Sequence, residues 1–388
     1  MKRRDFFKLT GTFTGGVLLL PDFLYSFASQ DNLRAGDSCI VFVQLNGGND
    51  GLNTFVPYSD GLYYNYRPAI SLPEKEVLPV AGGMGLHPAL KGFAAMQQAG
   101  DMSVIQNVGY PNPVRSHFRS QEIWNTGSAS SQYLSEGWLG RYLDQHYHEH
   151  HPTGALNVDT LDNLAVKGVE PNNITVSDPA KLKLNPDSSI KLSDNPQLDF
   201  AKKIASSLSD GSAEIQKALE KAGVRENTYP ANPLSKNLEW ISRLIKGGLS
   251  SKVYYTSLNG FDTHDNQLAV HNQKLAVLDE AVYAFYNDLK NNGKLEEVTI
   301  VVFSEFGRRV ADNGKGTDHG TAAPMFIIGG KNKGRIIGNN PDLKNLDNGD
   351  LKHEIDFRSV YASLLNDKFS FNPKLIGIEN APLKGLFS

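Results

Sequence analysis

The chain of 388 residues has little of several features that define common protein classes. It has one cysteine, Cys39, so no disulfide can form within the chain and a disulfide scaffold is excluded. Its 36 glycines follow no three-residue repeat, which excludes a collagen-like fibre. Its 39 Lys and Arg against 42 Asp and Glu leave a net charge of −3, so there is no basic footprint for nucleic acid. With 40% hydrophobic and 21% charged residues, the chain is predicted to be globular.

Residues 1–28 have the three parts of an export signal. Adjacent Arg3 and Arg4, followed by two phenylalanines, match the twin-arginine form, whose route exports folded proteins. The apolar run around residues 17–20 is far shorter than the roughly 20 residues that cross a bilayer, so we expect no stable membrane span. Cleavage is expected near Ala28. We therefore expect a periplasmic or otherwise exported protein, with the twin-arginine export machinery as a partner.

Short apolar runs rich in β-branched residues alternate with segments of helical periodicity. The runs are predicted to be buried strands, and they cover residues 39–45, 102–108, 252–258, 298–304 and 324–329. The helical segments cover residues 87–99, 116–124 and 268–291. This alternation predicts an α/β fold, an α/β/α sandwich with a mostly parallel central sheet. We expect one domain over residues 29–388, and the polar stretch at about 157–234 is predicted to be an insertion or cap.

Polar residues gather in the loops that follow the predicted strands. In an open parallel sheet, ligands bind beyond the carboxyl ends of the strands, so chemistry is expected in these loops. The loops begin at Asn46, Gly109, Asn259 and Glu305, and a further polar cluster at 316–321 precedes the last strand. We therefore examine these five segments for candidate ligands and nucleophiles.

Carboxylates and imidazoles in these loops form a set suited to one or two divalent metal ions, of Zn, Mn, Mg or Ca. The candidate ligands are Asp50, Asp262, His264, Glu305, Asp318 and His319. Each residue alone has an ordinary structural explanation, because Asn-Asp-Gly is typical of a turn and Asp-x-His can be a hydrogen-bonded pair. Their shared placement at strand ends is the feature that indicates a metal site.

A hydroxyl group and arginines accompany these candidate ligands. Ser116 lies at the predicted start of a helix, where backbone N–H groups can receive an anion, although a serine there is also a common helix cap. Arg119 can hold the oxygens of a tetrahedral anion with its forked guanidinium. Hydroxyl, arginine and metal together indicate attack on phosphorus or sulfur.

Three other patterns point less clearly to function. The His-rich tract at 146–151 is more typical of a solvated helix end than of a metal site. The Tyr-rich residues 58–67 either form a stacking surface for sugars or pack against neighbouring strands. No P-loop lysine follows Gly47 and Gly48, so nucleotide binding is disfavoured.

Six ordered motifs make the chain resemble a large bacterial family catalogued as domain of unknown function 1501. They are Asn-Gly-Gly-Asn-Asp-Gly-Leu-Asn-Thr at 46–54, Gly-Tyr-Pro-Asn-Pro at 109–113, Arg-Ser-His-Phe-Arg-Ser at 115–120, Gly-Phe-Asp-Thr-His at 260–264, Phe-Ser-Glu-Phe-Gly-Arg-Arg at 303–309 and Thr-Asp-His-Gly-Thr-Ala-Ala-Pro at 317–324. The resemblance covers nearly the whole chain after the leader. That family is grouped with the alkaline phosphatase and sulfatase superfamily, which implies a metal site at the strand ends of an α/β/α sandwich.

The resemblance also implies roles for individual residues. Asp50 looks like the first metal-ligating aspartate of the superfamily, and Ser116 looks like its nucleophile. Asp262 and His264 resemble the Asp/His pair of one metal site, with His319 as its remaining histidine.

The match to the superfamily departs at one dipeptide. Glu305 stands where an Asp-His dipeptide usually begins, and Phe306 occupies the place of the histidine. Either Asp318 or His117 fills in for the missing imidazole, or the protein binds one metal, or none. The Cys/Ser-x-Pro-x-Arg context that sulfatases need for formylglycine is absent from the sequence, so standard sulfatase chemistry is not expected.

The leading hypothesis is an exported, metal-dependent hydrolase of phosphate or related esters, acting on a small-molecule or glycan anionic ester. Ser116 is the expected nucleophile, with His117 beside it, and Arg119 or Arg308 is expected to steer the anion. The alternative is a non-catalytic envelope protein that uses the same fold to bind a ligand or to assemble. Convergence of the candidate ligands in space would favour the first hypothesis.

Overall fold

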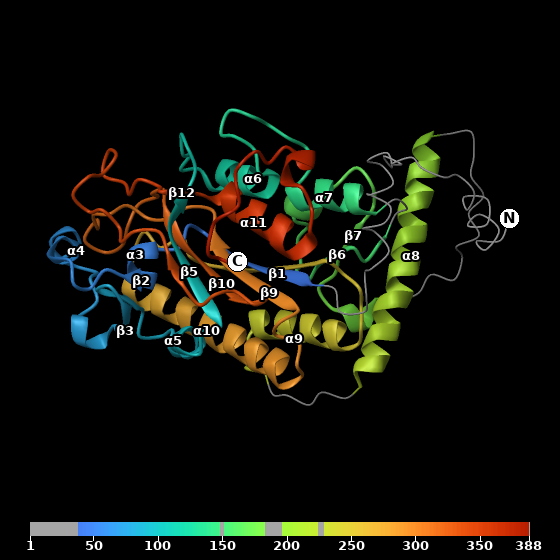
Figure 1. Cartoon of the computed structure of the whole chain (residues 1–388), viewed down its shortest axis with the longest axis horizontal. Helices are drawn as coiled ribbons and strands as arrows, with labels where there is room; N and C mark the ends of the chain where they lie inside the picture. The colour runs from blue at the N-terminus through green and yellow to red at the C-terminus, as the bar shows by residue number, and fades with distance from the viewer. Residues whose placement is uncertain (1–37, 148–150, 183–195, 224–228, 388) are drawn as a thin grey trace, which may run out of the picture. The chain divides into compact units, whose positions relative to one another are not determined.

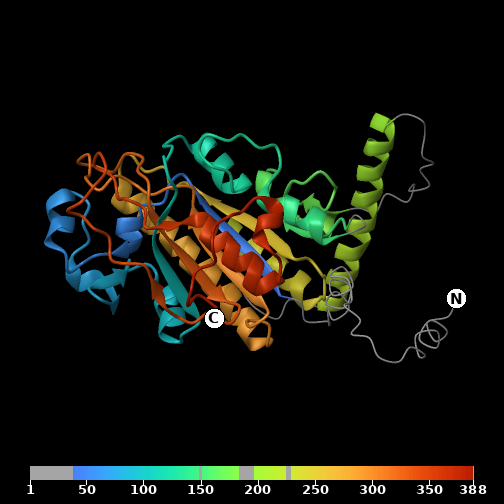
Figure 2. The same ribbon diagram turned by 45° about the horizontal axis from the view of Figure 1, so that its top comes forward.

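A nine-stranded mixed sheet runs through the part of the chain that the structure describes (Figures 1 and 2). The structure is a computed structural model that describes residues 38–147, 151–182, 196–223 and 229–387. Residues 38–388 form one unit, and the expected export signal at 1–28 lies outside the described residues. In the described ranges, no helix has both the length and the apolar character that a membrane span requires.

The strands are ordered β11-β5-β10-β9-β1-β8-β6-β7 across the sheet, and β12 also pairs with β5. Their bounds are β1 (Cys39–Asn46), β5 (Met102–Gly109), β6 (Ala155–Asn157), β7 (Asn173–Thr175), β8 (Val253–Asn259), β9 (Val298–Ser304), β10 (Ala323–Gly329), β11 (Ile336–Ile337) and β12 (Ile355–Asp356). All five strands predicted from the apolar runs are present within one residue of their expected bounds.

Helices cover both faces of the sheet (Figures 1 and 2). One face carries α5 (Lys91–Gln98), α9 (Pro233–Lys246) and α10 (Gln267–Asn291), with α8 (Pro196–Ala222) packed against α9. The other carries α6 (His117–Thr126), α7 (Trp138–His146) and α11 (Phe357–Phe369). Side chains of β1 alternate between the two cores, since Val41 and Val43 join the first core while Ile40 and Phe42 join the second. The predicted α/β/α sandwich is confirmed.

Smaller elements surround the sandwich. A second sheet has the order β2-β4-β3, and α3 and α4 lie beside it. The bounds are β2 (Phe55–Val56), β3 (Leu78–Ala81), β4 (Met84–Leu86), α3 (Gly51–Thr54) and α4 (Gly61–Tyr66). Short 3-10 turns are η1 (Glu74–Glu76), η2 (Leu164–Val166), η3 (Pro179–Lys181) and η4 (Pro373–Ile376).

The direction of β10 decides which loops meet. Strands β1, β8 and β9 pair in parallel, whereas β10 is antiparallel to both of its neighbours, β5 and β9. The amino end of β10 therefore lies at the edge where β5 and β9 end. The segment before β10 and the loops after the parallel strands thus reach the same edge.

The range expected as an insertion contributes to the main sheet. Strand β7 pairs in parallel with β6, which pairs in parallel with β8, and the long helix α8 follows.

The cysteine of β1, Cys39, is buried, and burial raises the pKa of its thiol to about 12. This thiol is accordingly inert at neutral pH.

Candidate metal centre

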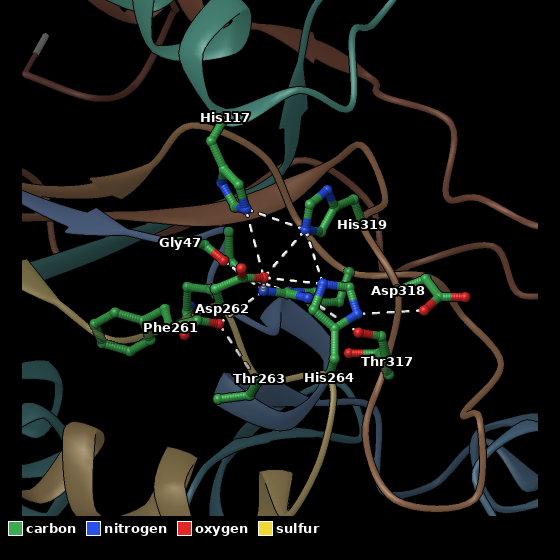
Figure 3. Close-up of polar contacts among 12 residues, drawn as sticks. Gly47, His117, Phe261, Asp262, Thr263, His264, Thr317, Asp318 and His319 are labelled. Atoms are coloured by element: carbon green, nitrogen blue, oxygen red, sulfur yellow. Dashed lines mark hydrogen bonds and ion pairs between the residues drawn. The ribbon is translucent and has the colours of Figure 1, made fainter.

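Three loops that are far apart in the sequence bring imidazoles and one carboxylate together at the edge of the sheet (Figure 3). His117 is the first residue of α6, which follows β5. Asp262 and His264 follow β8, and His319 precedes β10. Because β10 is antiparallel to β9, His319 reaches the same edge as the others.

The ligand atoms of these four residues are in close contact. The Nε2 atom of His319 lies 3.0 Å from Nε2 of His117 and 3.0 Å from Nε2 of His264. Oδ1 of Asp262 lies 3.4 Å, 3.0 Å and 3.1 Å from Nε2 of His117, His264 and His319 respectively. The ligand atoms of His117, Asp262 and His319 all lie within 4.8 Å of one another, and His264 contacts two of these three (Figure 3).

The other nitrogen of each imidazole faces an acceptor outside the cluster. Nδ1 of His117 lies 2.9 Å from Oε1 of Glu305, and Nδ1 of His319 lies 2.8 Å from the backbone carbonyl of Arg115. Nδ1 of His264 lies 3.3 Å from Oδ1 of Asp318. With the proton on Nδ1, each ring turns the lone pair of Nε2 inward, which is the arrangement of metal-bound histidines.

Protons alone cannot satisfy this cluster. There are five close contacts among the three Nε2 atoms and Asp262, and three Nε2 atoms supply at most three hydrogens. With every Nδ1 protonated, supplying those hydrogens would also place three imidazolium cations in contact. A cation bound between the lone pairs and the carboxylate removes both problems.

Arg308 holds Asp262 in this position. Its buried guanidinium donates to Oδ1 of Asp262 at 2.8 Å and to the carbonyls of Gly48, Phe261 and Thr317 at 2.6 Å, 2.9 Å and 3.0 Å. Burial alone would raise the pKa of Asp262, but the hydrogen bond and the positive charge of Arg308 outweigh burial and hold that pKa far below its usual value. Asp262 is thus an anion at neutral pH.

Glu305 supports His117 from behind. Oε1 of Glu305 accepts from the backbone N–H of Gly47 at 2.9 Å and from Nε2 of Gln121 at 3.2 Å, besides its contact with His117. Burial favours a raised pKa for Glu305, yet the hydrogen bond from His117 and those from the backbone lower it. Gly47 needs to be glycine because its φ is +118° and a Cβ would lie 2.4 Å from the backbone nitrogen of Asp262.

Phe306 forms an apolar floor under two of the histidines. Its buried ring lies 4.9 Å from the His117 ring and 5.1 Å from the His319 ring, centroid to centroid. His117, on α6, enters the cluster of ligand atoms, and its replacement of the imidazole expected at Phe306 stays a prediction. Of the two residues expected to fill in, His117 joins the ligand atoms and Asp318 stands behind His264.

A model of the family described as "Protein of unknown function (DUF1501)" matches residues 102–366. The chain belongs to this family. The resemblance expected from the six motifs is confirmed by this match. No curated protein matches the sequence.

Several solved structures resemble this DUF1501 chain at a distance. The phosphonate monoester hydrolase of Agrobacterium radiobacter is 8% identical, with 90% of this chain and 78% of that chain covered and a TM-score of 0.42. The sulfatase PsFucS1 from Pseudoalteromonas sp. is 12% identical, with 93% and 72% covered and a TM-score of 0.39. The C-terminal periplasmic domain of EcEptC from Escherichia coli, solved in complex with Zn, is 9% identical, with 76% and 74% covered and a TM-score of 0.38.

The structure places Asp50 in a buried ion pair. Its Oδ2 lies 2.6 Å from Nη1 of Arg67, with both side chains fully buried, and also accepts from Gln267. Asp50 forms no hydrogen bond or ion pair with His117, Asp262 or His319, so its expected ligation remains a prediction. Of the Tyr-rich residues 58–67, Tyr63 and Arg67 are buried whereas Tyr58, Tyr64 and Tyr66 are half-buried, so a stacking surface there stays a prediction.

The remaining candidates lie around the cluster. Ser116 caps α6 only through its backbone, since its side chain makes no cap hydrogen bond, and the residue is exposed. Arg119 donates to the carbonyl of Ser130 at 3.0 Å and pairs with Glu122 at 2.8 Å, so its guanidinium is engaged away from the histidines. Arg308 is buried on the floor of the site, which favours a positioning role over direct contact with an anion. These roles stay predictions.

Sequence reasoning missed three contributors to the site. The carbonyl of Arg115 fixes the ring of His319, the buried Arg67 neutralises Asp50, and Gln267 links Asp50 to Thr317 through a 2.7 Å hydrogen bond. A backbone carbonyl leaves no trace in sequence. Arginine and glutamine are common on protein surfaces, so nothing in the sequence marks Arg67 and Gln267 as buried parts of the site. Only the fold identifies them.

Proposed function

We propose that this protein is a metal-dependent hydrolase of phosphate or related esters. The observation that carries the proposal is that the Nε2 atoms of three histidines contact one oxygen of Asp262. Each of these imidazoles is also held through its Nδ1 atom by an acceptor outside the cluster. An ester of phosphoric or sulfuric acid is the substrate class for which a cationic centre beside a hydroxyl is suited.

His117, Asp262 and His319 are the residues that would hold the ion, with His264 at its open side. The distances between their ligand atoms fit, because tetrahedral zinc with bonds of about 2.0–2.1 Å has ligands about 3.3 Å apart. Imidazole donors favour zinc over calcium or magnesium, which prefer oxygen ligands alone. When bound, the ion would act as a Lewis acid on an oxygen of the ester.

Ser116 is the residue that we propose as nucleophile. It directly precedes His117, its exposed hydroxyl is not used in capping α6, and the start of the helix favours an anion. Glu305 keeps His117 in place while an ester approaches, and Arg308 keeps Asp262 ionised. The chain's own groups thereby orient the centre. The hydroxyl oxygen of Ser116 forms a bond to phosphorus or sulfur while the bond to the alcohol oxygen breaks, and the serine proton passes to the departing alcohol. Water then cleaves the ester on Ser116, which releases the acid and restores the hydroxyl.

We further propose that the protein is exported through the twin-arginine pathway to the periplasm or beyond. The paired Arg3 and Arg4 and the small residues near Ala28 support this. Expression in cells with and without a functional twin-arginine translocase tests it. A mature chain that begins near residue 29 should appear outside the cytoplasm only in the first strain, and equal export in both would contradict the proposal.

Hydrolysis assays test the enzymatic proposal. Purified protein should release p-nitrophenol from p-nitrophenyl phosphate, p-nitrophenyl phenylphosphonate or p-nitrophenyl sulfate after loading with zinc or manganese. Activity should fall at least about 100-fold in His319→Ala and in Ser116→Ala. His353→Ala removes a histidine outside the centre and should keep wild-type activity. An active Ser116→Ala would show that the nucleophile is another group.

The alternative, a non-catalytic binding protein on the same fold, is the account that survives if metal binds and no ester is cleaved. The observation that favours this alternative is that the exposed Ser116 hydroxyl forms no hydrogen bond with the histidines or with Asp262. This alternative would be favoured if the zinc-loaded protein binds phosphate or sulfate but hydrolyses none of the three esters.

A further inference from the structure

A cavity of about 320 Å³ lies beside the metal centre, at the same edge of the sheet. Its walls come from the ends of β1, β6 and β8, through Asn46, Asn157 and Asn259, and from α6, through Gln121 and Asn125. We call it the carboxamide cavity. No group of the proposed reaction lines it.

The walls of the carboxamide cavity are polar and carry little charge. Seven of its fifteen lining residues are asparagine or glutamine, and none is lysine or arginine. Two of its three acidic residues are neutralised by cations outside the lining, Glu122 by Arg119 at 2.8 Å and Asp162 by Lys167 at 3.0 Å. Carboxamides both donate and accept hydrogen bonds, as hydroxyl groups do. The lining therefore suits an uncharged ligand with many hydroxyls.

Two apolar side chains stand exposed in the wall of this polar cavity. Phe118 is 89% exposed and Leu161 is 77% exposed, and both line the cavity. A phenylalanine so exposed at the first turn of a helix contributes nothing to the core. An aromatic face beside carboxamides matches a sugar ring, which has an apolar face and a polar edge.

The cavity is linked to the metal centre through α6 and Glu305. Gln121 lines it and donates to Oε1 of Glu305, which holds His117 from behind. Phe118 follows His117 directly in α6. A second, larger hollow of about 1020 Å³ shares Asp159 and Asn259 with the carboxamide cavity. The two hollows adjoin each other and offer space for a chain-like ligand.

We infer that the carboxamide cavity binds an uncharged sugar residue of an oligosaccharide, adjacent to the residue that carries the ester. Only the presence of an ester on the neighbouring residue rests on the proposed function. The sugar site itself is inferred from the residues that line the cavity. A second phosphate or sulfate is disfavoured because the lining has no cation, and a lipid chain is disfavoured because the walls are polar.

Binding of uncharged saccharides tests the inference without any turnover. The purified protein is titrated calorimetrically with hexasaccharides of galactose, glucose, mannose, xylose and N-acetylglucosamine, and with spermidine as a cationic probe. We expect at least one hexasaccharide to bind and spermidine not to bind. Phe118→Ala should weaken that saccharide about tenfold, and Asn125→Leu should weaken it by a similar factor. Leu375→Ala, which removes another exposed apolar side chain outside the cavity, should leave it unchanged.

The outcomes separate this inference from the proposed function. Saccharide binding that is lost in Phe118→Ala supports the sugar site, even if no p-nitrophenyl ester is hydrolysed. Ester hydrolysis with no binding of any hexasaccharide overturns the sugar site and leaves the proposed function intact. Equal affinity in wild type, Phe118→Ala and Asn125→Leu, or binding of spermidine alone, also overturns it.

Discussion

The Nε2 atoms of His117 and His319 lie 3.0 Å apart, while the Nδ1 atom of each ring faces an acceptor outside the pair. With Nδ1 protonated in both rings, the two Nε2 lone pairs face each other, which is unfavourable unless a proton or a metal cation lies between them. The carboxylate of Asp262 lies against both rings. A bound cation would therefore stabilise the centre formed by these two histidines and Asp262.

Replacing His319 should abolish tight metal binding. His319→Ala removes the imidazole that contacts both His117 and His264, and it leaves at most two histidines with Asp262. We expect bound zinc to fall from about one equivalent to near zero after dialysis. Zinc should also stop raising the melting temperature of the variant. His353→Ala is the matched control, and the same zinc loss in the control would contradict a specific site.

Glu305 should act through His117 without touching the ion. In Glu305→Gln, the amide cannot accept from His117, Gly47 and Gln121 together as the carboxylate does. Zinc affinity should fall about 10–100-fold, measured by competition with a chromogenic chelator. Asp318→Asn changes an exposed group behind His264 and should have a smaller effect. Complete loss of zinc in Glu305→Gln would instead make Glu305 a direct ligand.

Asp50 should matter for stability even without metal. Asp50→Asn leaves Arg67 buried with no counter-ion, and the free energy of unfolding should drop by about 3–5 kcal/mol. Denaturant unfolding of the chelator-treated protein measures this. If Asp50→Asn loses zinc affinity but keeps its metal-free stability, the main role of Asp50 is that of a metal ligand.

The same ion pair makes a prediction about pH. Burial would raise the pKa of Asp50, but the Arg67 guanidinium outweighs burial and holds that pKa below its usual value. A lowered folded-state pKa stabilises the fold above the unfolded-state pKa, which is about 3.9, and the stabilisation is lost as the pH falls through the folded value. The stability difference between wild type and Asp50→Asn should therefore be constant from about pH 7 to pH 5 and should shrink below about pH 4. A difference that already shrinks between pH 7 and pH 5 would contradict the assignment.

Arg308 should behave as a structural support of the site. Arg308→Met strands Asp262 and several carbonyls without their donor, so we expect about 3–5 kcal/mol of lost stability together with weaker zinc binding. Arg309→Ala, at a partly exposed neighbour, should cost less than about 1 kcal/mol. A stable Arg308→Met that binds zinc normally but hydrolyses no ester would instead indicate direct contact with substrate.

The sandwich could be predicted from sequence because its signals are local. The run at Cys39–Asn46 is apolar and β-branched, and the spacing of Leu275, Leu278, Val282 and Phe285 gives α10 one buried face. The direction of β10 could not be predicted, since an apolar run reads equally well in a parallel or an antiparallel strand. The strand β7 was hidden for another reason, because three residues give too short a pattern to recognise.

The sequence could predict which loops form the site. It could not predict which of their residues are ligands and which support the ligands. Asp262, His264 and His319 were expected as ligands and lie in contact, whereas Glu305 and Asp318 lie behind imidazoles instead of among the ligand atoms. Which carboxylate touches the centre depends on partners that come from other segments of the chain. The contact between Arg67 and Asp50 joins residues only 17 positions apart, yet neither residue signals burial in its own segment.

The metal content of the native exported protein tests the central claim most directly. The protein is purified from its mature, exported form without added metal or chelator, and its zinc, manganese, magnesium and calcium are measured by mass spectrometry. We predict about one equivalent of zinc or manganese per chain, lost in His319→Ala and kept in His353→Ala. A native protein that holds none of the four ions, and that takes up none on incubation with each, would contradict the account.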